Sequence, residues 1–444
     1  MLTRSDRSDS FIAKYFLMET EEFYPLVYFL PRYICMVKGF NTSCNYQINC
    51  CMKKLIVLMC ISLYAFSMVR AKEYRVTSES ECKKAADLVV PGDEIVIANN
   101  NYSPWELTIK ANGTPAKPII IRAETPGKVI YSGDVNKPVF QLAGSFTQIS
   151  GLTFSACNIS KKDGGTGVLI ELKGTKYCRV TNCAFLKNTV KTQFMPLVII
   201  SGKAENNRVD HCQFTGNIDN QELQIKITAD AVPLYSMIDH NIFQDKDKVS
   251  WQNFNGGECV QVGQDPILLG TLYAYTTVRD NQFIRCNGEP EVISNKSSGN
   301  NYINNYFENC QGELVMRGGH DCKIDSNTFK GGTGGIRING THHIITNNRI
   351  SSVPSGIRLM YGMAKGKTEI GFYIAASDCL VKSNHISDAV TGILIGDSKN
   401  ADWTGKFDTT RYPSRTMQDI APFNNTLLDN KITGTKTPVV HNEN

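Results

Sequence analysis

A short motif that recurs through most of the chain constrains its fold more than any other feature. Each copy closes on a polar residue, usually Asn, two positions before Phe or Ile. Successive copies lie 21 to 46 residues apart, and the longer spacings indicate insertions. The Phe and Ile positions of the series are Phe154, Phe185, Phe214, Phe243, Phe283, Phe307, Phe329, Ile350, Ile386 and Ile432. A unit of just over twenty residues predicts a solenoid.

The composition of the units indicates which solenoid to expect. They are rich in Val, Ile, Phe, Asn and Gly, alternate over short runs such as YINNYF, and show no helical periodicity. The sequence therefore predicts an all-β fold, a right-handed single-stranded parallel β-helix. We expect the recurring Asn to stack at a turn in the left-handed backbone conformation and to bond the next coil. A short N-terminal capping helix, begun by Ser78 or Ser80, is expected to cover the open end.

The beginning of the chain differs from the rest. Met52–Ala71 has two lysines, an apolar run too short to span a bilayer and a small-residue end, which predicts a secretory signal peptide. We interpret residues 1–51 as an unstructured upstream extension and residues 72–444 as a single β-helix domain. The expected localisation is secreted or periplasmic, with a lipid anchor at Cys60 as a minor alternative.

Charge and cysteine content limit the partners. Without residues 1–71 the acidic and basic residues nearly balance, so we expect no nucleic-acid partner. We also expect no transmembrane segment in the mature chain, and a monomer. Ten of the fifteen cysteines lie beyond residue 71. They are expected to be mostly buried small hydrophobes, with one or two disulfides.

One stretch, NGEPEVISNKSSGN, gathers charged side chains. Glu289 and Glu291 lie two residues apart, so on a strand they point the same way. Lys296 follows, and Arg317 comes 21 residues after it, one short coil later. Because neighbouring coils are about 4.8 Å apart, we expect the lysine and the arginine to be neighbours on one face.

The paired acids predict a cation site. Two close carboxylates repel each other unless a cation lies between them, and a site with only oxygen ligands suits Ca²⁺. One coil earlier, Asn255 offers a neutral oxygen and Glu258 a further acid, while Gly256 and Gly257 are expected to let a bulky ligand approach. The alternative is that each charged residue is an ordinary part of a solvated surface.

A cation, a lysine and an arginine on an open face suit an acidic sugar polymer. Bound Ca²⁺ would neutralise a uronate carboxylate, Lys296 would take the C5 proton, and Arg317 would offset the developing charge or assist departure of the O4 group. This reaction is a β-elimination. A β-helix hydrolase would need two or three aspartates around a water, and a non-catalytic carbohydrate-binding β-helix stays the less favoured alternative.

Three blocks in order carry a family resemblance: NGGE at Asn255–Glu258, the E-x-E-x-x-x-x-K pattern that ends at Lys296, and MRGG around Arg317. From about Lys72 to the end the chain resembles polysaccharide lyase family 6, the chondroitinase B and alginate lyase family. The resemblance implies Ca²⁺-dependent elimination from a uronate-containing polysaccharide. It also implies roles for matched residues: the base is Lys296, the acid is Arg317, and the calcium ligands are Asn255, Glu289 and Glu291.

This chain differs from the family pattern at one position, and the resemblance is compatible with two substrates. Members usually have His directly after the catalytic arginine, whereas this chain has Gly318 there and His320 two positions later. The segment GGIRING is more similar to the alginate lyases, which favours mannuronate-rich alginate; dermatan sulfate, the chondroitinase B substrate, is the alternative. Further candidates to bind substrate, besides Glu258 and His320, are Arg337, Arg358, Tyr361 and Glu369. The alternative for the two arginines is that they pair with surface acids.

Overall fold

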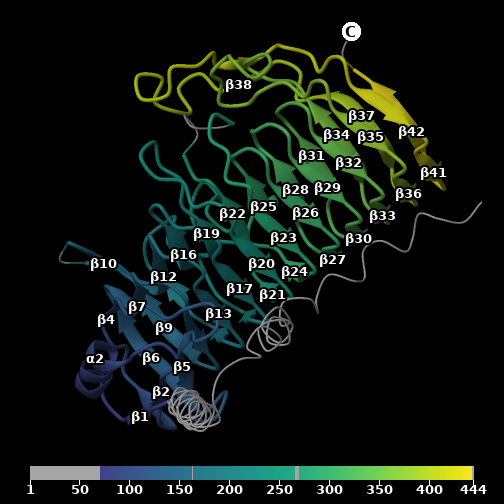
Figure 1. Cartoon of the computed structure of the whole chain (residues 1–444). Helices are drawn as coiled ribbons and strands as arrows, with labels where there is room; N and C mark the ends of the chain where they lie inside the picture. Colours follow the sequence, from purple (N-terminus) through teal and green to yellow (C-terminus); the bar gives the residue numbers. More distant parts are fainter. Residues whose placement is uncertain (1–70, 163, 266–269, 443–444) are drawn as a thin grey trace, which may run out of the picture. The chain divides into compact units, whose positions relative to one another are not determined.

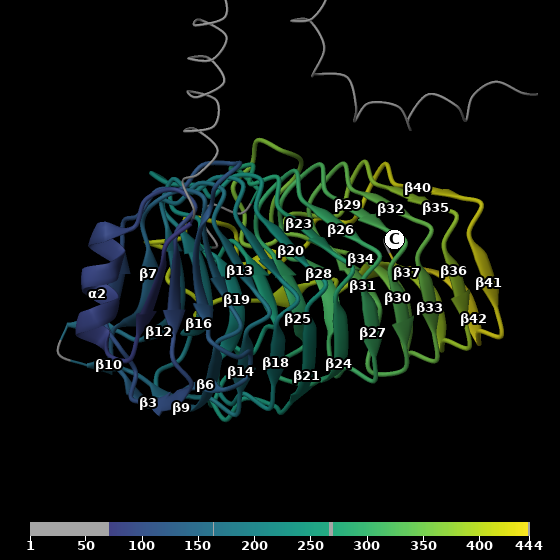
Figure 2. The same ribbon diagram turned by 60° about the horizontal axis from the view of Figure 1, so that its bottom comes forward.

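The strands follow one another up a single solenoid (Figure 1). The computed structural model describes residues 71–162, 164–265 and 270–442. Each full coil adds one strand to each of three parallel sheets, and the neighbours within a sheet come from successive coils. Figure 2 shows these coils stacked from the purple end, beside α2, to the yellow end. The predicted all-β parallel β-helix is confirmed.

The three sheets are named here the first sheet, the second sheet and the site sheet. The first sheet contains β1 (Glu73–Val76), β2 (Glu94–Ile97), β5 (Ile119–Ala123), β8 (Thr147–Ser150), β13 (Arg179–Thr181), β17 (Arg208–Asp210), β20 (Met237–Asp239), β23 (Thr277–Arg279), β26 (Asn301–Ile303), β29 (Lys323–Asp325), β32 (Ile344–Thr346), β35 (Leu380–Lys382) and β40 (Thr426–Leu428). The second sheet contains β3 (Asn100–Tyr102), β6 (Val129–Val135), β9 (Thr153–Ile159), β14 (Ala184–Leu186), β18 (Gln213–Thr215), β21 (Ile242–Lys246), β24 (Gln282–Cys286), β27 (Tyr306–Glu308), β30 (Thr328–Lys330), β33 (Arg349–Ser351), β36 (His385–Ser387) and β41 (Lys431–Thr433), with β15 (Thr189–Val190) paired to β9. The site sheet contains β4 (Leu107–Ile109), β7 (Pro138–Leu142), β12 (Val168–Lys173), β16 (Pro196–Ser201), β19 (Gln221–Ile225), β22 (Val260–Val262), β25 (Glu291–Asn295), β28 (Glu313–Met316), β31 (Ile336–Ile338), β34 (Ser355–Met360), β37 (Thr391–Asp397) and β42 (Thr437–His441).

Two antiparallel pairs lie outside the three sheets. They are β10 (Lys161–Lys162) with β11 (Gly165–Thr166), and β38 (Ala401–Asp402) with β39 (Met417–Gln418). The second pair closes the base of a long connection, residues 398–418, which we call the arm. In Figure 1 the connection that carries β38 extends along the top of the molecule, away from the yellow strands.

The predicted capping helix is confirmed as α2 (Glu79–Leu88). Ser78 is the N-cap, and its side chain accepts a hydrogen bond from the Glu81 N–H at 3.3 Å. The Glu81 carboxylate accepts one in return from the Thr77 N–H at 2.7 Å. These two hydrogen bonds fix the start of the helix, and α2 buries Cys82 and Ala85 against the first coils.

The repeat positions form one stack inside the second sheet. Each Phe or Ile of the motif from Phe154 to Ile432 pairs in register with the next. From Phe154 to Phe329 successive rings are stacked, with centroids 4.4 to 5.4 Å apart. Each coil therefore buries its ring on the previous coil, which explains why the motif recurs regardless of any chemistry.

The Asn of the motif forms a buried ladder, as expected, but its backbone is not the left-handed one. Asn305, for example, accepts hydrogen bonds from the backbone and side chain of Asn281 and donates to Asn327 at 3.0 Å. The left-handed residue is the one before it, Asn304, with φ of 53°. Two adjacent residues thus divide the roles that the prediction gave to one.

The prediction of one or two disulfides is wrong for the described residues. All ten cysteines beyond residue 71 are free and buried. Cys183 and Cys212, for example, take the ladder position in two early coils, and the Cys212 N–H donates to Asn241 at 2.9 Å. These thiols fill core space as small apolar groups.

Two further predictions concern residues outside the described part. The upstream extension at 1–51 and all of the signal peptide Met52–Ala71 but its last residue lie there. Within the described residues, no helix has the length and apolar character needed to cross a membrane.

Candidate active site

Lys296 and Arg317 occupy equivalent positions of adjacent coils, as their spacing predicted. They directly follow β25 and β28, whose last residues, Asn295 and Met316, are paired in register. The Lys296 N–H donates to the carbonyl of the coil below at 2.8 Å, and the Arg317 N–H donates to the Asn295 carbonyl at 3.0 Å. The strand hydrogen bonds therefore set both side chains on one face of the site sheet.

The turns after these two strands are tied together through a buried amide. Asn295 donates to the carbonyls of Ser297 at 2.9 Å and Gly318 at 2.8 Å. Gly319 has φ of 96°, and a Cβ there would lie 2.2 Å from the Ser297 carbonyl oxygen. Only glycine allows this approach of the two coils, which holds the segments carrying Lys296 and Arg317 in place.

Three buried carboxylates, Glu258, Glu289 and Glu291, form what we call the acid cluster. One oxygen of each lies within 4.8 Å of the others. Glu258 precedes β22 by two residues, and the register of β22 with β25 sets it opposite Glu291 on the next coil. A bulge between Glu291 and Ile293 interrupts the pairing of β25 with β28, and bulges commonly redirect side chains beside active sites.

Every member of the acid cluster has hydrogen-bond donors. Glu289 accepts from the N–H groups of Gly256 at 2.6 Å and Gly257 at 3.1 Å. The two glycines therefore hold a carboxylate, and a Cβ on Gly257 would lie 2.5 Å from the backbone of the next coil. Their expected role in admitting a bulky ligand is replaced by this close packing.

The other two acids bind amides, a hydroxyl and an arginine. Glu258 accepts from Gln221 at 2.9 Å and from Gln261 at 2.5 Å. Glu291 accepts from the Ser294 hydroxyl and from the Arg337 guanidinium, each at 2.5 Å. The cluster is thus fixed by donors from four coils of the site sheet, those of β19, β22, β25 and β31.

The pKa values of two of these acids, Glu289 and Glu291, are shifted in opposite directions. Burial, with the charges of Glu258 and Glu291, raises the pKa of Glu289 well above its usual value. Burial acts in the same direction on Glu291, but the neighbouring cations, first Arg317, outweigh it and lower its pKa to about 2. One carboxyl group therefore holds a proton readily while its neighbour stays charged.

Lys296 and Arg317 lie beside this cluster. The Lys296 Nζ is 3.6 Å from a Glu258 oxygen, and its side chain is 6% exposed. The Arg317 guanidinium lies over the rings of Phe372 and Tyr373, at 5.3 and 5.2 Å from their centroids, and its Nε has no hydrogen-bond partner among the described residues. Burial lowers the pKa of Arg317, but Tyr373 and the acid cluster outweigh it, so the pKa is raised.

A pocket of about 590 Å³ opens above these two side chains. The solenoid lines it with Phe194, Gln221, Gln224, Lys226, Asn255, Gln261, Gln264, Lys296 and Arg317; loops of the C-terminal half add Phe372, Lys406, Phe407, Asp408, Arg411 and Tyr412. Five of these residues are Lys or Arg, and one is acidic. The pocket therefore favours an anionic ligand.

The predicted arginines divide into two environments. Arg337 donates to Glu291 and so belongs to the framework of the acid cluster. Arg358 pairs in register with Arg337, yet it donates to both oxygens of Glu313 and, at 2.6 Å, to Asp397. Arg358 thus makes the kind of acid pairing that was the alternative to substrate binding.

The remaining predicted residues lie outside the pocket lining, apart from Asn255, which contributes to it. His320 is 2% exposed and its Nδ1 is 2.8 Å from the Thr341 hydroxyl; burial lowers its pKa to about 4. Tyr361 is buried, with its hydroxyl donating to the Asn442 carbonyl at 3.2 Å. Glu369 is exposed and accepts from the Lys365 N–H at 2.7 Å.

Sequence reasoning did not find the half of the pocket that comes from the C-terminal loops. Phe372 lies in the connection after β34, and Lys406 to Tyr412 lie in the arm. The long spacings of 36 and 46 residues before Ile386 and Ile432 mark both insertions. Spacing shows that an insertion exists, but not which coil it folds over.

The acid cluster fits a hard divalent cation. Three carboxylates supply only oxygen, the donor that Ca²⁺ prefers, and a cation would remove the repulsion that raises the pKa of Glu289. Each carboxylate oxygen has more than one lone pair, so the hydrogen bonds described above leave capacity for a metal. Glu258, predicted as a further acid, is a member of the cluster.

Comparisons with known proteins agree with this architecture. The family model described as chondroitinase B matches residues 76–444. A polysaccharide lyase of family PL6 from Pseudopedobacter saltans is 22% identical, with a TM-score of 0.67 over 83% of this chain and 92% of that one. A mannuronic acid specific family 6 lyase from human gut microbiota is 26% identical, with a TM-score of 0.65 over 81% and 82%. The PL6 alginate lyase AlyGC, as a mutant, is 25% identical, with a TM-score of 0.63 over 80% and 47%. A comparison with curated proteins gave no match.

Proposed function

Because this chain belongs to the chondroitinase B family of polysaccharide lyases, we propose that it cleaves a uronate-containing polysaccharide by Ca²⁺-dependent β-elimination. The observation that carries the proposal is the position of Lys296, 3.6 Å from Glu258 of the acid cluster and one coil from Arg317. A potential base, Lys296, and a fixed cation, Arg317, line one cationic pocket, and the acid cluster that could hold a metal ion lies beside Lys296. Together these features suit elimination next to a carboxylate.

The ion would be held by Glu289 and Glu291, with Glu258 as the third acid of the cluster; Asn255 stays a proposed neutral ligand from the motif. When bound, Ca²⁺ supplies positive charge that neutralises a uronate carboxylate and so makes its C5 proton more acidic. Gln221 and Gln261 hold Glu258 in place through its two oxygens. The protein groups thus orient the metal site before substrate arrives.

Lys296 removes the C5 proton onto Nζ. The C5–H electron pair becomes the C4–C5 double bond, and the bond from C4 to the glycosidic oxygen breaks. Arg317 has a raised pKa and keeps its own proton, so we propose that it stabilises negative charge on the substrate through hydrogen bonds. The leaving oxygen takes its proton from protonated Lys296 or from water, and no water is added across the bond.

We propose mannuronate-rich alginate as the substrate. The support is the 26% identical lyase that is mannuronic acid specific, together with the motif around Arg337. Dermatan sulfate is the second candidate, favoured by the chondroitinase B description of the matching family model. Arg358, a candidate to bind carboxylates or sulfates, is occupied by Glu313 and Asp397, so it does not distinguish the two substrates.

A substrate panel tests the proposal. The protein is incubated with polymannuronate, polyguluronate and dermatan sulfate, with Ca²⁺ or with a chelator, and the ultraviolet absorbance of unsaturated uronate is followed. We expect absorbance to rise fastest on polymannuronate and to be lost with the chelator. New reducing ends without ultraviolet absorbance would indicate hydrolysis and overturn the elimination mechanism.

We further propose that the protein is exported and acts as a monomer. The support for export is the charge and apolar pattern of Met52–Ala71. N-terminal sequencing of the protein recovered outside the cytoplasm, with sedimentation to measure its mass, tests both points. A mature chain that still begins before Met52 would contradict the signal peptide.

A further inference from the structure

The arm is firmly attached beside the pocket. The Trp403 indole donates to Gln418 at 2.8 Å, and Gln418 donates to the Tyr361 carbonyl at 2.8 Å. Phe407 stacks on Phe372 with ring centroids 4.7 Å apart. Since Phe372 in turn lies under the Arg317 guanidinium, one continuous chain of contacts joins the arm to the proposed catalytic group.

The outer part of the arm has a defined shape of its own. The Asp408 carboxylate accepts hydrogen bonds from the backbone of Thr410 at 2.9 Å and of Arg411 at 3.2 Å. The Tyr412 N–H donates to the Asp408 carbonyl at 2.8 Å. These turns bring Lys406, Arg411 and Tyr412 to the same pocket wall.

The two arm cations are available for a ligand. Lys406 and Arg411 are exposed, and neither makes an ion pair with any residue that the structure describes. Both lie beside aromatic rings: the Lys406 Nζ is 5.4 Å from the Trp403 ring centroid, and the Arg411 guanidinium carbon is 5.0 Å from that of Tyr412. Most other arginines near the site, such as Arg337 and Arg358, already bind carboxylates.

We propose that Lys406, Arg411 and Tyr412 form a binding site for a second carboxylated sugar, next to the one that reacts at Lys296 and Arg317. The inference rests on the proposed function and assigns to the arm the recognition of the neighbouring uronate. An aromatic ring beside a guanidinium suits a pyranose carrying a carboxylate, because the ring covers its apolar face and the cation pairs with its charge. The arm thus sets affinity for the chain without taking part in proton transfer.

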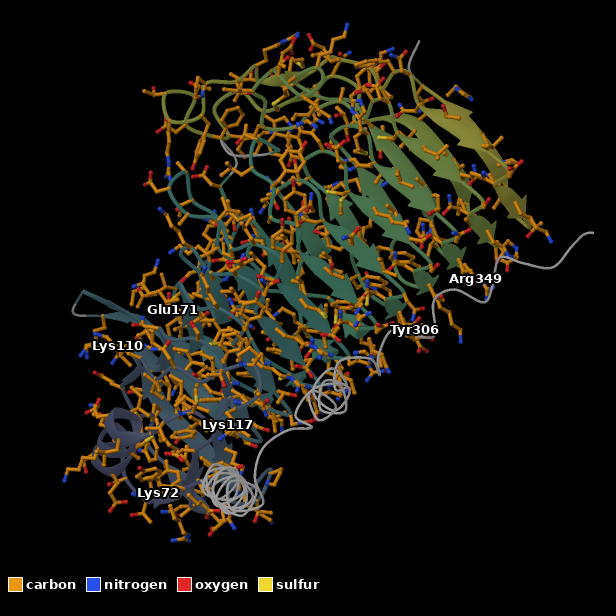
Figure 3. The ribbon with its side chains drawn as sticks, viewed as in Figure 1. Lys72, Lys110, Lys117, Glu171, Tyr306 and Arg349 are labelled. Carbon is orange, nitrogen blue, oxygen red and sulfur yellow. The ribbon has the colours of Figure 1, made fainter. Side chains whose placement is uncertain are left out.

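The test compares two double variants of the full chain that each lose one lysine and one arginine. Lys406→Ala with Arg411→Ala removes the arm cations. Arg349→Ala with Lys431→Ala is the matched control, because both are exposed residues of the second sheet, outside the pocket lining. Figure 3 shows Arg349 on the lower right edge, away from the arm at the top. All four side chains are exposed, so truncation leaves the core intact.

On a mannuronate tetrasaccharide, the arm variant is expected to raise KM about tenfold or more, since hydrogen bonds to charged groups are among the strong ones. Its kcat is expected to stay within about twofold of the wild type, and the control is expected to match the wild type in both. Lys406→Arg with Arg411→Lys, which keeps the charge, is expected to recover most of the affinity. A KM for the arm variant equal to that of the control overturns the inference.

Failure of the proposed function is distinguishable from failure of this site. If the wild type forms no unsaturated product, elimination is wrong, and the dissociation constant of the same tetrasaccharide is then measured by calorimetry. A dissociation constant about tenfold weaker in the arm variant than in the control supports the arm site even then. Equal dissociation constants overturn it.

Discussion

At the scale of single residues, the site is defined by how the solenoid divides charge among buried groups. Glu289 and Glu291 are two residues apart, yet the first has a raised pKa and the second a lowered one. Burial acts to raise the pKa of both; at Glu289 the charges of two other acids add to it, whereas at Glu291 those of Arg317 and Arg337 outweigh it. A site that holds one proton and one charge is prepared to exchange the proton for a cation.

Calcium binding should therefore release protons. Ca²⁺ stabilises the charged form of Glu289 and lowers its raised pKa, so below that raised pKa binding displaces a proton. Affinity is expected to increase as the pH rises through the pKa of Glu289. Calorimetry in two buffers of different ionisation enthalpy, at mildly acidic and mildly alkaline pH, measures this release.

Glu289→Gln is the control for proton release, because it keeps the shape and cannot titrate. We expect this variant to bind Ca²⁺ more weakly and to release no proton. A wild type that binds Ca²⁺ with the same affinity at both pH values, and with no proton release, would contradict the assignment of Glu289.

The charge of Glu291 should stabilise the metal-free fold. Its folded pKa is lowered to about 2, so its contribution is present above the pKa of the unfolded chain and is lost as the pH falls toward the folded value. Urea unfolding in chelator is expected to show stability falling across this acid range in the wild type. Glu291→Gln should start less stable and show a weaker fall; parallel curves for the two proteins would refute this role.

At the scale of elements, the repeat motif was sufficient to predict the coils. Each Phe and Ile of the series lies in register with the next, because one ring per coil must be buried on its neighbour. The motif did not show that the left-handed backbone belongs to the residue before the ladder Asn and not to the Asn itself. Both are polar, and the sequence does not show which of two adjacent residues takes the positive φ.

This division of roles can be measured at one coil. Asn305→Ala breaks hydrogen bonds to Asn281, Asn327 and the Val278 carbonyl, and buried groups left without partners cost about 1–3 kcal/mol each. Asn304→Gly keeps the left-handed backbone at an exposed position and is expected to change stability by less than about 0.5 kcal/mol. Urea unfolding compares the two variants. Equal losses of unfolding free energy in the two variants would contradict the division of roles between Asn304 and Asn305.

The residues of the candidate site that lie on the regular coils could be predicted from the sequence, whereas those that lie on loops could not. Lys296 and Arg317 are one short coil apart, so their spacing alone made them neighbours. Glu258, expected one coil earlier as a further acid, is a member of the acid cluster. The arm's Lys406 and Arg411 are placed at the pocket by tertiary contacts, such as those of Phe372 and Gln418, which the sequence does not reveal.

At the scale of the whole molecule, the described coils are held together by stacking, with no disulfide among their cysteines. The ten described cysteines are free and buried, and a native disulfide would contribute about 2–4 kcal/mol. We therefore expect the melting temperature to be the same with and without a reducing agent. A clear decrease with reductant would show that a disulfide forms in solution.

The whole fold also explains why one lysine can be decisive. The solenoid places Lys296 between the acid cluster and a pocket with four further cations, which is the position that the proposed base requires. No other lysine of the described chain is within ion-pair distance of the acid cluster. The central claim is that this amine removes the C5 proton.

The most direct test is the rate of unsaturated product formation by Lys296→Ala on polymannuronate with Ca²⁺, followed by ultraviolet absorbance. Loss of a general base typically costs about 10²–10⁴ in rate, so we predict a loss of this size, with Ca²⁺ binding and melting temperature maintained. Lys431→Ala, at an exposed position outside the pocket lining, is expected to retain the wild-type rate. Turnover by Lys296→Ala within a few-fold of the Lys431→Ala control would contradict the account.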